Sequence, residues 1–254
     1  YDLEGRTRPD FFEQFDAALE VRPAAVISSF GGFREPEEEK LAELGIVNIG
    51  TATTLREAKV LRAAGCGAVI VQGAEAAGPR LSFEDPEDAL VGLMSLVPAA
   101  VRATGLPVIA AGGIATGRGM LAAFALGAEG IQMGTRFALS EESSASDAFK
   151  RLCIGLEEGG TMLALKKIGP TRLIRNDFYT AVETAENRGA SAEELKELLG
   201  RGRSKRGIFE GNLADGELEI GQIASLIRDL PPAGEIVRQI IDEYNAGVKS
   251  LTTL

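Results

Sequence analysis

Five short apolar runs dominate the first half of the chain and predict five buried strands. They cover residues 24–30, 46–50, 68–73, 107–113 and 130–137. The runs are Val/Ile-rich and nearly continuous rather than alternating, which is typical of parallel strands covered on both faces. Their starts lie 22, 22, 39 and 23 residues apart, so each gap has room for a helix. The order therefore predicts right-handed βαβ units.

Segments with helical patterns fill these gaps. They cover residues 35–44, 54–64, 86–104 and 117–126, and the last of them ends at a glycine. After residue 140 the pattern changes to charged helical stretches at residues 145–158, 191–199, 220–229 and 234–244. We expect residues 1–150 to form the βα units, residues 151–215 a helical insertion on the substrate side, and residues 216–254 C-terminal helices that pack back on the barrel.

Composition excludes several classes of function. The 254 residues carry 37 acidic and 27 basic side chains, a net charge of −10, which disfavours a nucleic acid or an anionic membrane surface as partner. Histidine is absent, so a Ser-His-Asp or Cys-His nucleophile and a zinc site with imidazole ligands are excluded. Cys66 and Cys153 are too few for a disulfide framework, which favours a cytoplasmic location. Both cysteines are expected to be buried.

Two neighbouring strands end in glycine corners. Gly112 and Gly113 follow the fourth apolar run, and Gly134 with Thr135 lies in the fifth, about 23 residues further along. At the carboxyl end of a strand, glycine lets backbone N–H groups approach a phosphate, and the following helix directs its positive end there. The loops after the last two strands of a (β/α)₈ barrel often bind phosphate. The corners therefore predict a ligand that carries a phosphate.

The same residues resemble the nitronate monooxygenase-like flavoproteins, which include the flavin-dependent enoyl-acyl carrier protein reductases and a related NADH:quinone reductase. The resemblance lies in residues 51–54 (TATT), residues 71–78 (VQGAEAAG), and residues 107–137 with the SEES that follows them. Residues 221–227 and 232–236 also look like the C-terminal helices of this family.

The resemblance implies FMN bound on a TIM-type (β/α)₈ barrel. Gln72 would meet the isoalloxazine or ribityl region, and the glycine corners would hold the phosphate. The residues that the resemblance assigns to the cofactor are Gln72, Gly73, Ala111, Gly112, Gly113, Met133, Gly134 and Thr135. A reduced nicotinamide, NADH or NADPH, would be the electron donor.

One departure from the family concerns acid-base chemistry. Family members usually carry a histidine where this chain has Pro79, and proline cannot transfer a proton. An acid-base role would then pass to Glu75, Lys166, Tyr179 or water, unless the reaction needs none. Basic residues of the segment 166–175 (Lys166, Lys167, Arg172 and Arg175) are candidates for the substrate entrance, with a solvated face as the alternative.

A second departure concerns the start of the barrel. The five predicted strands correspond to the fourth to eighth of the family, and five parallel strands do not close an eight-stranded barrel. We therefore expect residue 1 to lie partway through a longer polypeptide, or a second chain to complete the barrel. An open half-barrel is the alternative, and exposed apolar surface on the C-terminal helices would allow a homodimer.

Two further segments have a structural and a functional interpretation. The basic loop of residues 201–206 (RGRSKR) is either a solvated turn or a contact for an anion or substrate. Residues 85–88 (DPED) suggest a helix N-terminus more than a metal site.

The function predicted at this point is an FMN-dependent oxidoreductase. It would move electrons from a reduced nicotinamide or a nitronate-like substrate through flavin to a small organic acceptor or oxygen. An enoyl-acyl carrier protein reductase and an NADH:quinone reductase are the alternatives within the family. Alternatives of another class are a non-redox phosphate-binding barrel lyase or isomerase, and a non-catalytic flavin-binding protein.

Overall fold

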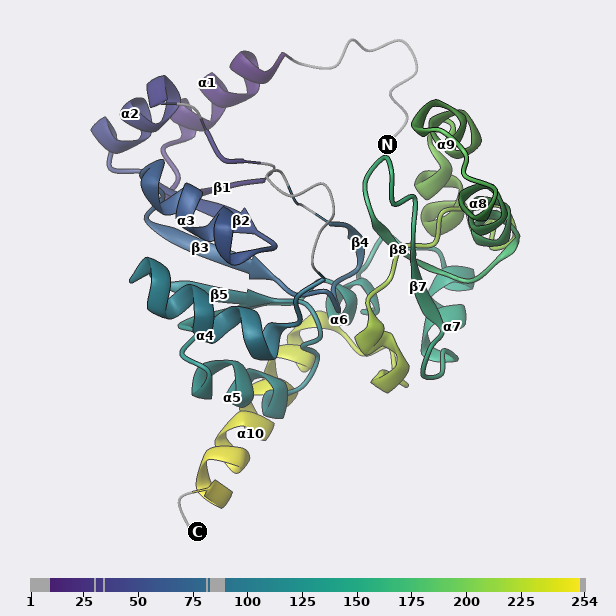
Figure 1. The fold of residues 1–254 in the computed structure, drawn as a ribbon. Coiled ribbons are helices and arrows are strands. Elements are labelled where there is room, and N and C mark those ends of the chain that lie inside the picture. Colours follow the sequence, from purple (N-terminus) through teal and green to yellow (C-terminus); the bar gives the residue numbers. More distant parts are fainter. Residues whose placement is uncertain (1–9, 30, 34, 81, 83–89, 252–254) are drawn as a thin grey trace.

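Five parallel strands form one curled sheet in the computed structural model, which describes residues 10–29, 31–33, 35–80, 82 and 90–251 (Figure 1). Their order is the order of the chain: β1 (Ala25–Ser28), β2 (Val47–Ala52), β3 (Ala68–Gln72), β5 (Val108–Ala111) and β6 (Gly130–Gln132). Each strand lies within or overlaps one of the five apolar runs, so the predicted parallel strands of a barrel-like α/β fold are confirmed.

Helices cover one face of this sheet. They are α2 (Glu35–Glu43), α3 (Leu55–Ala63), α4 (Leu93–Thr104) and α5 (Gly117–Ala125), while α1 (Phe11–Val21) precedes β1. Side chains alternate along β3, so Val69 and Val71 join the core on the helix side together with Leu61. Ile70 and Gln72 point to the other face. This alternation separates a packed apolar layer from the face that can hold a ligand.

Local signals fix where the helices begin. The hydroxyls of Thr54 and Thr116 accept a hydrogen bond from the third residue of α3 and α5, respectively. Helix α4 begins at Leu93 with Gly92 as its N-cap, later than the predicted start at residue 86. The predicted helix N-terminus at residues 85–88 lies outside the described residues.

A second, antiparallel sheet stands beside the first. Its order is β4 (Gly78–Pro79), β8 (Thr171–Ile174) and β7 (Thr161–Ala164). On its side of the molecule lie α7 (Asp147–Ile154), α8 (Asp177–Asn187) and α9 (Ala192–Leu199), whereas α6 (Thr135–Ala138) directly follows β6 (Figure 1). The segment predicted to be a helical insertion therefore also contains two strands. The helix expected at residues 220–229 is instead a short 3₁₀ turn, Gln222–Leu226.

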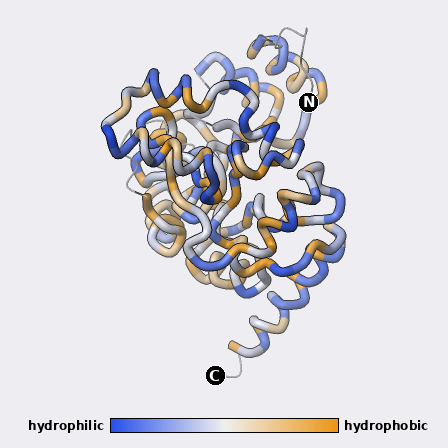
Figure 2. The backbone as a smooth tube through the Cα atoms, turned by 90° about the vertical axis from the view of Figure 1, so that its right-hand side faces the viewer, coloured by the Kyte–Doolittle hydropathy of each residue, from blue (hydrophilic) through white to orange (hydrophobic). Residues whose placement is uncertain are grey.

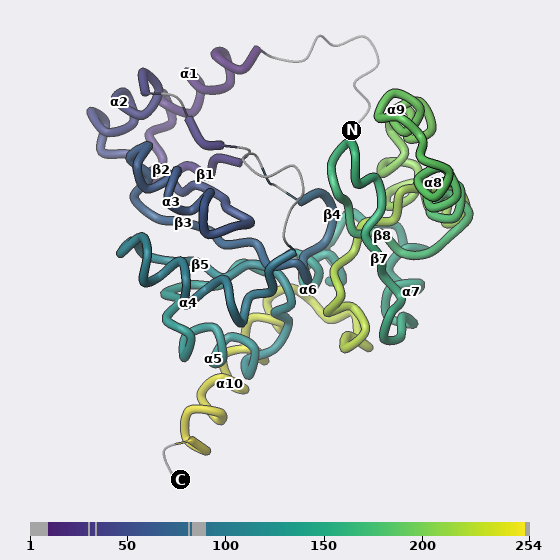
Figure 3. Tube along the Cα trace, in the orientation of Figure 1, coloured from purple at the N-terminus to yellow at the C-terminus, as the bar shows by residue number. Residues whose placement is uncertain are grey.

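The last element that the structure describes is a long helix, α10 (Ala233–Leu251), which packs on α5 (Figure 3). It is amphipathic, with hydrophilic and hydrophobic stretches alternating along it (Figure 2), and it buries Ile236 and Ile240. A Cβ atom at Gly117 would overlap the backbone at Ile240 and Tyr244. Glycine at the first position of α5 is thus what lets the two helices meet so closely.

Both cysteines are buried, as predicted. Cys66 lies in the core between the first sheet and its helices, and Cys153 lies on α7; neither forms a disulfide. No helix in the described part of the chain is both long enough and apolar enough to cross a membrane.

Candidate functional site

A cavity of about 280 Å³ opens at the carboxyl ends of the parallel strands. This volume is near the lower end of the range for small-molecule sites, roughly 300–1,000 Å³. The lining comes from strands of the parallel sheet, from the segments that follow them and from the 3₁₀ turn: Thr51, Ile70, Gln72, Ala76, Ala77, Ala111, Gly112, Gly113, Ile114, Gln132, Met133, Gly134, Thr135 and Ile223.

Strand register brings the first polar groups of the cavity together. Gln72 on β3 pairs with Ala111 on β5, and Ala111 pairs with Gln132 on β6. Because parallel strands end at one edge of the sheet, the two glutamine positions flank the Ala111 position in one row. The small side chain between them leaves room above the middle strand.

The corner after β5 requires glycine. Gly112 and Gly113 have φ angles of 103° and 65°, in the left-handed region that other residues avoid. A Cβ atom at Gly112 would lie 3.1 Å from Ala76, and one at Gly113 would lie 3.2 Å from Glu75. The corner therefore packs against the turn after β3, and its backbone lines the cavity.

The corner after β6 differs because it has free space. Gly134 has φ −94° and ψ −65°, and a Cβ atom there would meet nothing within 4 Å. Beside it, the Thr135 hydroxyl accepts the Gly221 N–H at 3.1 Å, which leaves the hydroxyl proton available to a ligand. An uncharged corner with open space and a hydroxyl donor fits the phosphate of a flavin nucleotide.

Helix α5 contributes less to an anion site than its sequence position predicts. Its Gly117 N–H donates to the Glu243 carboxylate of α10 at 2.8 Å, and its Gly119 N–H donates to Thr116 at 3.1 Å. We expected the positive end of this helix to bind the phosphate. That expectation is wrong for these two N–H groups, because they already donate to oxygens of the protein. The corner backbones and Thr135 remain as candidate donors.

The structure brings together all of the residues that the sequence assigned to the cofactor, apart from Gly73. That glycine lies behind the cavity, where Glu75 and Leu93 leave no room for a side chain. The sequence analysis assigned no cofactor role to the other lining residues, which are Thr51, Ile70, Ala76, Ala77, Ile114, Gln132 and Ile223. A polar residue at the end of an apolar strand was the available signal for Gln132, whereas nothing local indicated Ile223.

Glu75 lies outside the cavity lining. Its carboxylate accepts the Leu93 N–H at 3.1 Å and so caps the first turn of α4. Its backbone carbonyl accepts the Gln222 N–H at 3.0 Å. The contacts of Glu75 are those of a residue that orients the turn after β3.

The other two acid-base candidates also lie away from the cavity lining. Lys166 is exposed after β7, where its backbone N–H donates to Glu186 at 2.6 Å. The Tyr179 hydroxyl on α8 donates to Glu183 at 2.8 Å, and burial together with this hydrogen bond raises its pKa. No described residue that lines the cavity has an ionisable side chain.

The basic residues proposed for the substrate entrance have different surroundings. Lys167 donates its Nζ to the carbonyls of Gly189 and Ala190. Arg175 is exposed, whereas Arg172 is buried and donates to the Ala74 carbonyl at 2.7 Å. These three side chains therefore do not form one basic patch.

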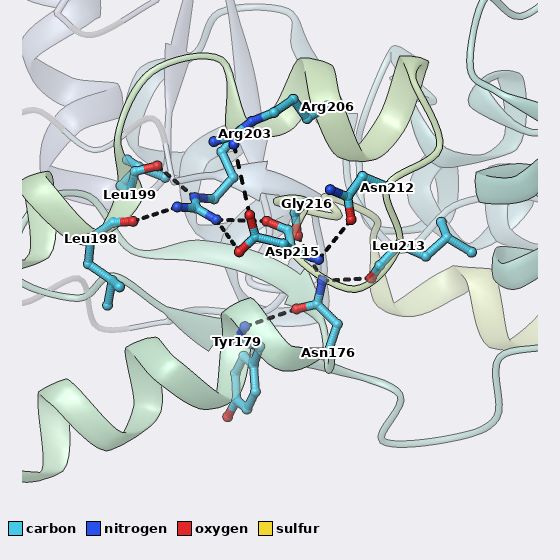
Figure 4. Close-up of polar contacts among 10 residues, drawn as sticks. All are labelled: Asn176, Tyr179, Leu198, Leu199, Arg203, Arg206, Asn212, Leu213, Asp215 and Gly216. Carbon is cyan, nitrogen blue, oxygen red and sulfur yellow. Dashed lines mark hydrogen bonds and ion pairs between the residues drawn. The ribbon is translucent and has the colours of Figure 1, made fainter.

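Part of the predicted basic loop, residues 201–206, is helical instead: residues 203–204 are α-helical and lead into a π-helical turn, Lys205–Phe209. Arg203 anchors this segment. Figure 4 shows its guanidinium between the carbonyls of Leu198 and Leu199 and the Asp215 carboxylate, with donor–acceptor distances of 2.6–2.9 Å. The guanidinium also lies 4.4 Å above the centre of the Phe178 ring. Arg203 thus caps the end of α9, and this arginine has a structural role.

Pro79 occupies the edge of the second sheet. It pairs with Thr171 on β8 and is exposed, while the next residue, Arg80, is buried. An edge position suits a residue without an N–H group.

The family is settled by comparison with known proteins. A model of the nitronate monooxygenase family matches residues 3–243. The chain belongs to the nitronate monooxygenase family. A probable nitronate monooxygenase of Staphylococcus saprophyticus is 34% identical over 242 residues, covering 94% of this chain and 68% of the relative. The nitronate monooxygenase of Pseudomonas aeruginosa is 37% identical over 233 residues, covering 89% and 64%. This family member thus spans about two thirds of the length of these relatives.

Solved structures agree with the family. FabK from Thermotoga maritima superposes with a TM-score of 0.85 at 31% identity, covering 98% of this chain and 76% of that chain. Nitroalkane oxidase from Streptomyces ansochromogenes gives a TM-score of 0.83 at 29% identity, covering 95% and 70%. The resemblance and the barrel-type α/β fold predicted from sequence are confirmed.

Proposed function

We propose that this nitronate monooxygenase family member is an FMN-dependent oxidoreductase. The observation that carries the proposal is the pair of glycine corners at the edge of the cavity, of which the Gly134 corner has room for a phosphate. FMN, when bound, supplies the redox chemistry by taking up electrons from a donor and passing them to an acceptor. The protein's own contribution is to bind and orient the ring and to exclude water.

Each part of the cavity has a task in this proposal. The Gly112–Gly113 backbone and the Thr135 hydroxyl bind the phosphate end. The Gln72 amide, at the end of β3, contacts the ring or the ribityl chain. The apolar side chains of Ile70 and Ile223 line the space around these groups and keep water away.

The cavity chemistry also bears on the substrate. Since the described lining residues carry no ionisable group, we propose that the substrate needs no proton removed by a side chain of this cavity. A nitronate meets this condition because it is already the deprotonated form of a nitroalkane. Reduction of an enoyl thioester is the second candidate, favoured by the likeness to FabK.

The first experiment tests cofactor binding with Gly134→Asp. Gly134 has an ordinary helical backbone and open space, so an aspartate fits without strain. Its charge should weaken FMN binding by up to about 1,000-fold, because like charges about 4 Å apart repel by about 4 kcal/mol at an effective dielectric constant of about 20. FMN affinity is measured by quenching of flavin fluorescence.

Gly234→Asp is the matched control, since it adds the same charge at an exposed position in the first turn of α10. Its FMN affinity should equal that of the parent. A parent protein that binds no FMN, or a Gly134→Asp variant with parental affinity, would overturn the assignment of the site.

A second experiment tests the electron donor and the acceptor. We propose a reduced nicotinamide as donor, so NADH or NADPH should bleach the visible absorption of the FMN-loaded protein without oxygen. Adding an enoyl thioester, a quinone or oxygen to the reduced protein then identifies the acceptor. If oxidised FMN is instead bleached by a nitronate alone, the nitronate is the donor and oxygen is the acceptor.

A further inference from the structure

The segment of residues 72–75, which comprises the last residue of β3 and the start of the turn after it, has all four of its backbone carbonyls bound by identified donors. Two of these donors are buried arginine side chains: Arg80 Nη1 reaches the carbonyl oxygens of Gln72 and Gly73 at 3.0 and 2.6 Å, and Arg172 Nη2 reaches that of Ala74 at 2.7 Å. The other two are backbone amides: the Ala76 N–H donates to Gly73 at 3.1 Å, and the Gln222 N–H donates to Glu75 at 3.0 Å. Such complete occupancy fixes the direction in which this segment presents its first residue, Gln72, to the cavity.

Arg172 lies on the strand that pairs with β4, and β4 directly follows the turn that Arg172 binds. This arginine lies on β8, 98 positions further along the chain than Ala74, and only 5% of its surface is exposed. Its Nη1 reaches the hydroxyl and carbonyl oxygens of Thr161 at 3.4 and 3.5 Å, while its Nε has no hydrogen-bond partner among the described residues. The guanidinium is thus held mainly by neutral oxygens.

A buried guanidinium keeps its charge. Burial and the neighbouring Arg80 lower the pKa of Arg172, and Glu75 raises it, but arginine is not deprotonated in proteins. Keeping a charge out of water is unfavourable unless that charge has an interaction to make. In this molecule the charge lies against the turn that follows Gln72, at the Ala74 carbonyl.

We propose that Arg172 is a positioning residue for the flavin, which binds the Ala74 carbonyl and places a positive charge where the reduced, anionic ring needs it. The inference rests on the proposed function, because it assumes that FMN occupies the cavity. Reduction adds negative charge to the ring, and a fixed positive charge in a poorly hydrated site then stabilises the reduced form more than the oxidised form. Arg172 would thereby raise the reduction potential.

The test measures the affinities of oxidised FMN and of reduced FMN, the latter without oxygen, for the parent and three variants. In Arg172→Gln, reduced FMN should lose about ten-fold more affinity than oxidised FMN, equivalent to a potential about 30 mV lower for a two-electron couple. Arg172→Lys retains the charge and should keep the parental ratio of the two affinities. Arg151→Gln, at an exposed arginine on α7, should change neither affinity.

The outcomes separate the two proposals. If the parent binds no FMN, the proposed function fails and this inference fails with it. If the parent binds FMN but Arg172→Gln weakens both redox forms equally, Arg172 supports only the structure and the inference alone is overturned. If Arg172→Gln does not fold, Arg172→Lys decides, because a changed affinity ratio with the charge retained contradicts the electrostatic role.

Discussion

Glu75 lies in the turn after β3, and its carboxylate accepts a hydrogen bond from the first turn of α4. We predict that Glu75→Gln changes catalysis little, because the amide oxygen can still accept the Leu93 N–H. Turnover per bound flavin should stay within about ten-fold of the parent, whereas loss of a general acid-base group costs about 10²–10⁴-fold. Glu75→Ala should cost about 1 kcal/mol of stability through the lost cap, measured by urea unfolding. A larger loss of turnover in Glu75→Gln would make Glu75 the proton-transfer group.

Glu219 gives a pH dependence that can be assigned to one carboxyl group. The Ser204 hydroxyl lies 2.6 Å from Glu217 and 2.8 Å from Glu219, but it has only one proton for the two carboxylates. Burial and the negative Glu217 raise the pKa of Glu219 above 4.5. The folded protein thus holds the carboxyl proton of Glu219 more tightly than the unfolded chain does. Its stability therefore falls as the pH rises from about 4.5 through the pKa of Glu219 in the folded state.

We therefore expect Glu219→Gln to raise the melting temperature at pH 7 and to flatten its dependence on pH in this window, by scanning calorimetry. Glu193→Gln, at an exposed position on α9, is the control and should leave the profile unchanged. A Glu219→Gln variant that is less stable than the parent at pH 7 would show that the charged carboxylate contributes to stability.

Residues that act through their backbone could be predicted from the sequence, and those that act across the fold could not. The corners at Gly112 and Gly134 follow apolar strands, so the strand ends themselves located them. Arg172 appeared only as one of several basic residues in its segment. Its partner Ala74 lies in the turn between β3 and β4, 98 positions earlier in the chain, and no periodicity or local motif reports such a contact.

At the scale of elements, the packing of α10 on α5 depends on one glycine. Gly117→Ala should destabilise the protein by about 3 kcal/mol, because its Cβ would overlap the backbone of α10. Gly119→Ala is the matched control two residues along the same helix, where a Cβ would be 3.4 Å from Ile114. It should be neutral or stabilising by up to about 1 kcal/mol. Urea unfolding of both variants gives the comparison, and equal stabilities would contradict the close approach.

The predicted elements were right where the apolar pattern was continuous. The Val/Ile runs alone were enough to predict the five parallel strands. Strands β7 and β8 were missed because each has four residues among charged neighbours, and their pairing comes from tertiary contacts rather than from alternation. Helix α8 was also missed, although Asn176 before it is an N-cap signal. The Gln222–Leu226 segment was predicted as a helix, but tertiary bonds to Glu75 and Thr135 hold its beginning.

At the scale of the whole molecule, the two sheets meet at the turn after β3. Arg172 to Ala74, Gln222 to Glu75 and Gly221 to Thr135 all cross between the parallel sheet with its loops and the later part of the chain. A ligand held at this junction therefore stabilises both parts together.

We predict that FMN at about 100 times its Kd stabilises the protein by about 2.7 kcal/mol. Amide hydrogen exchange should then slow in residues 171–174 and 218–221 as well as in residues 108–113, since all three segments adjoin the junction. Slower exchange confined to residues 108–113 would show that the two parts open independently.

The buried thiols make this protein suitable for optical labelling. Burial raises the pKa of Cys66 to about 11 and that of Cys153 to about 12, so neither forms an appreciable amount of thiolate at neutral pH. A maleimide dye would then react quickly only with a cysteine introduced on the surface. Two such dyes, one on α3 and one on α9, would report by energy transfer how the distance between the sheets changes, without removal of either native cysteine.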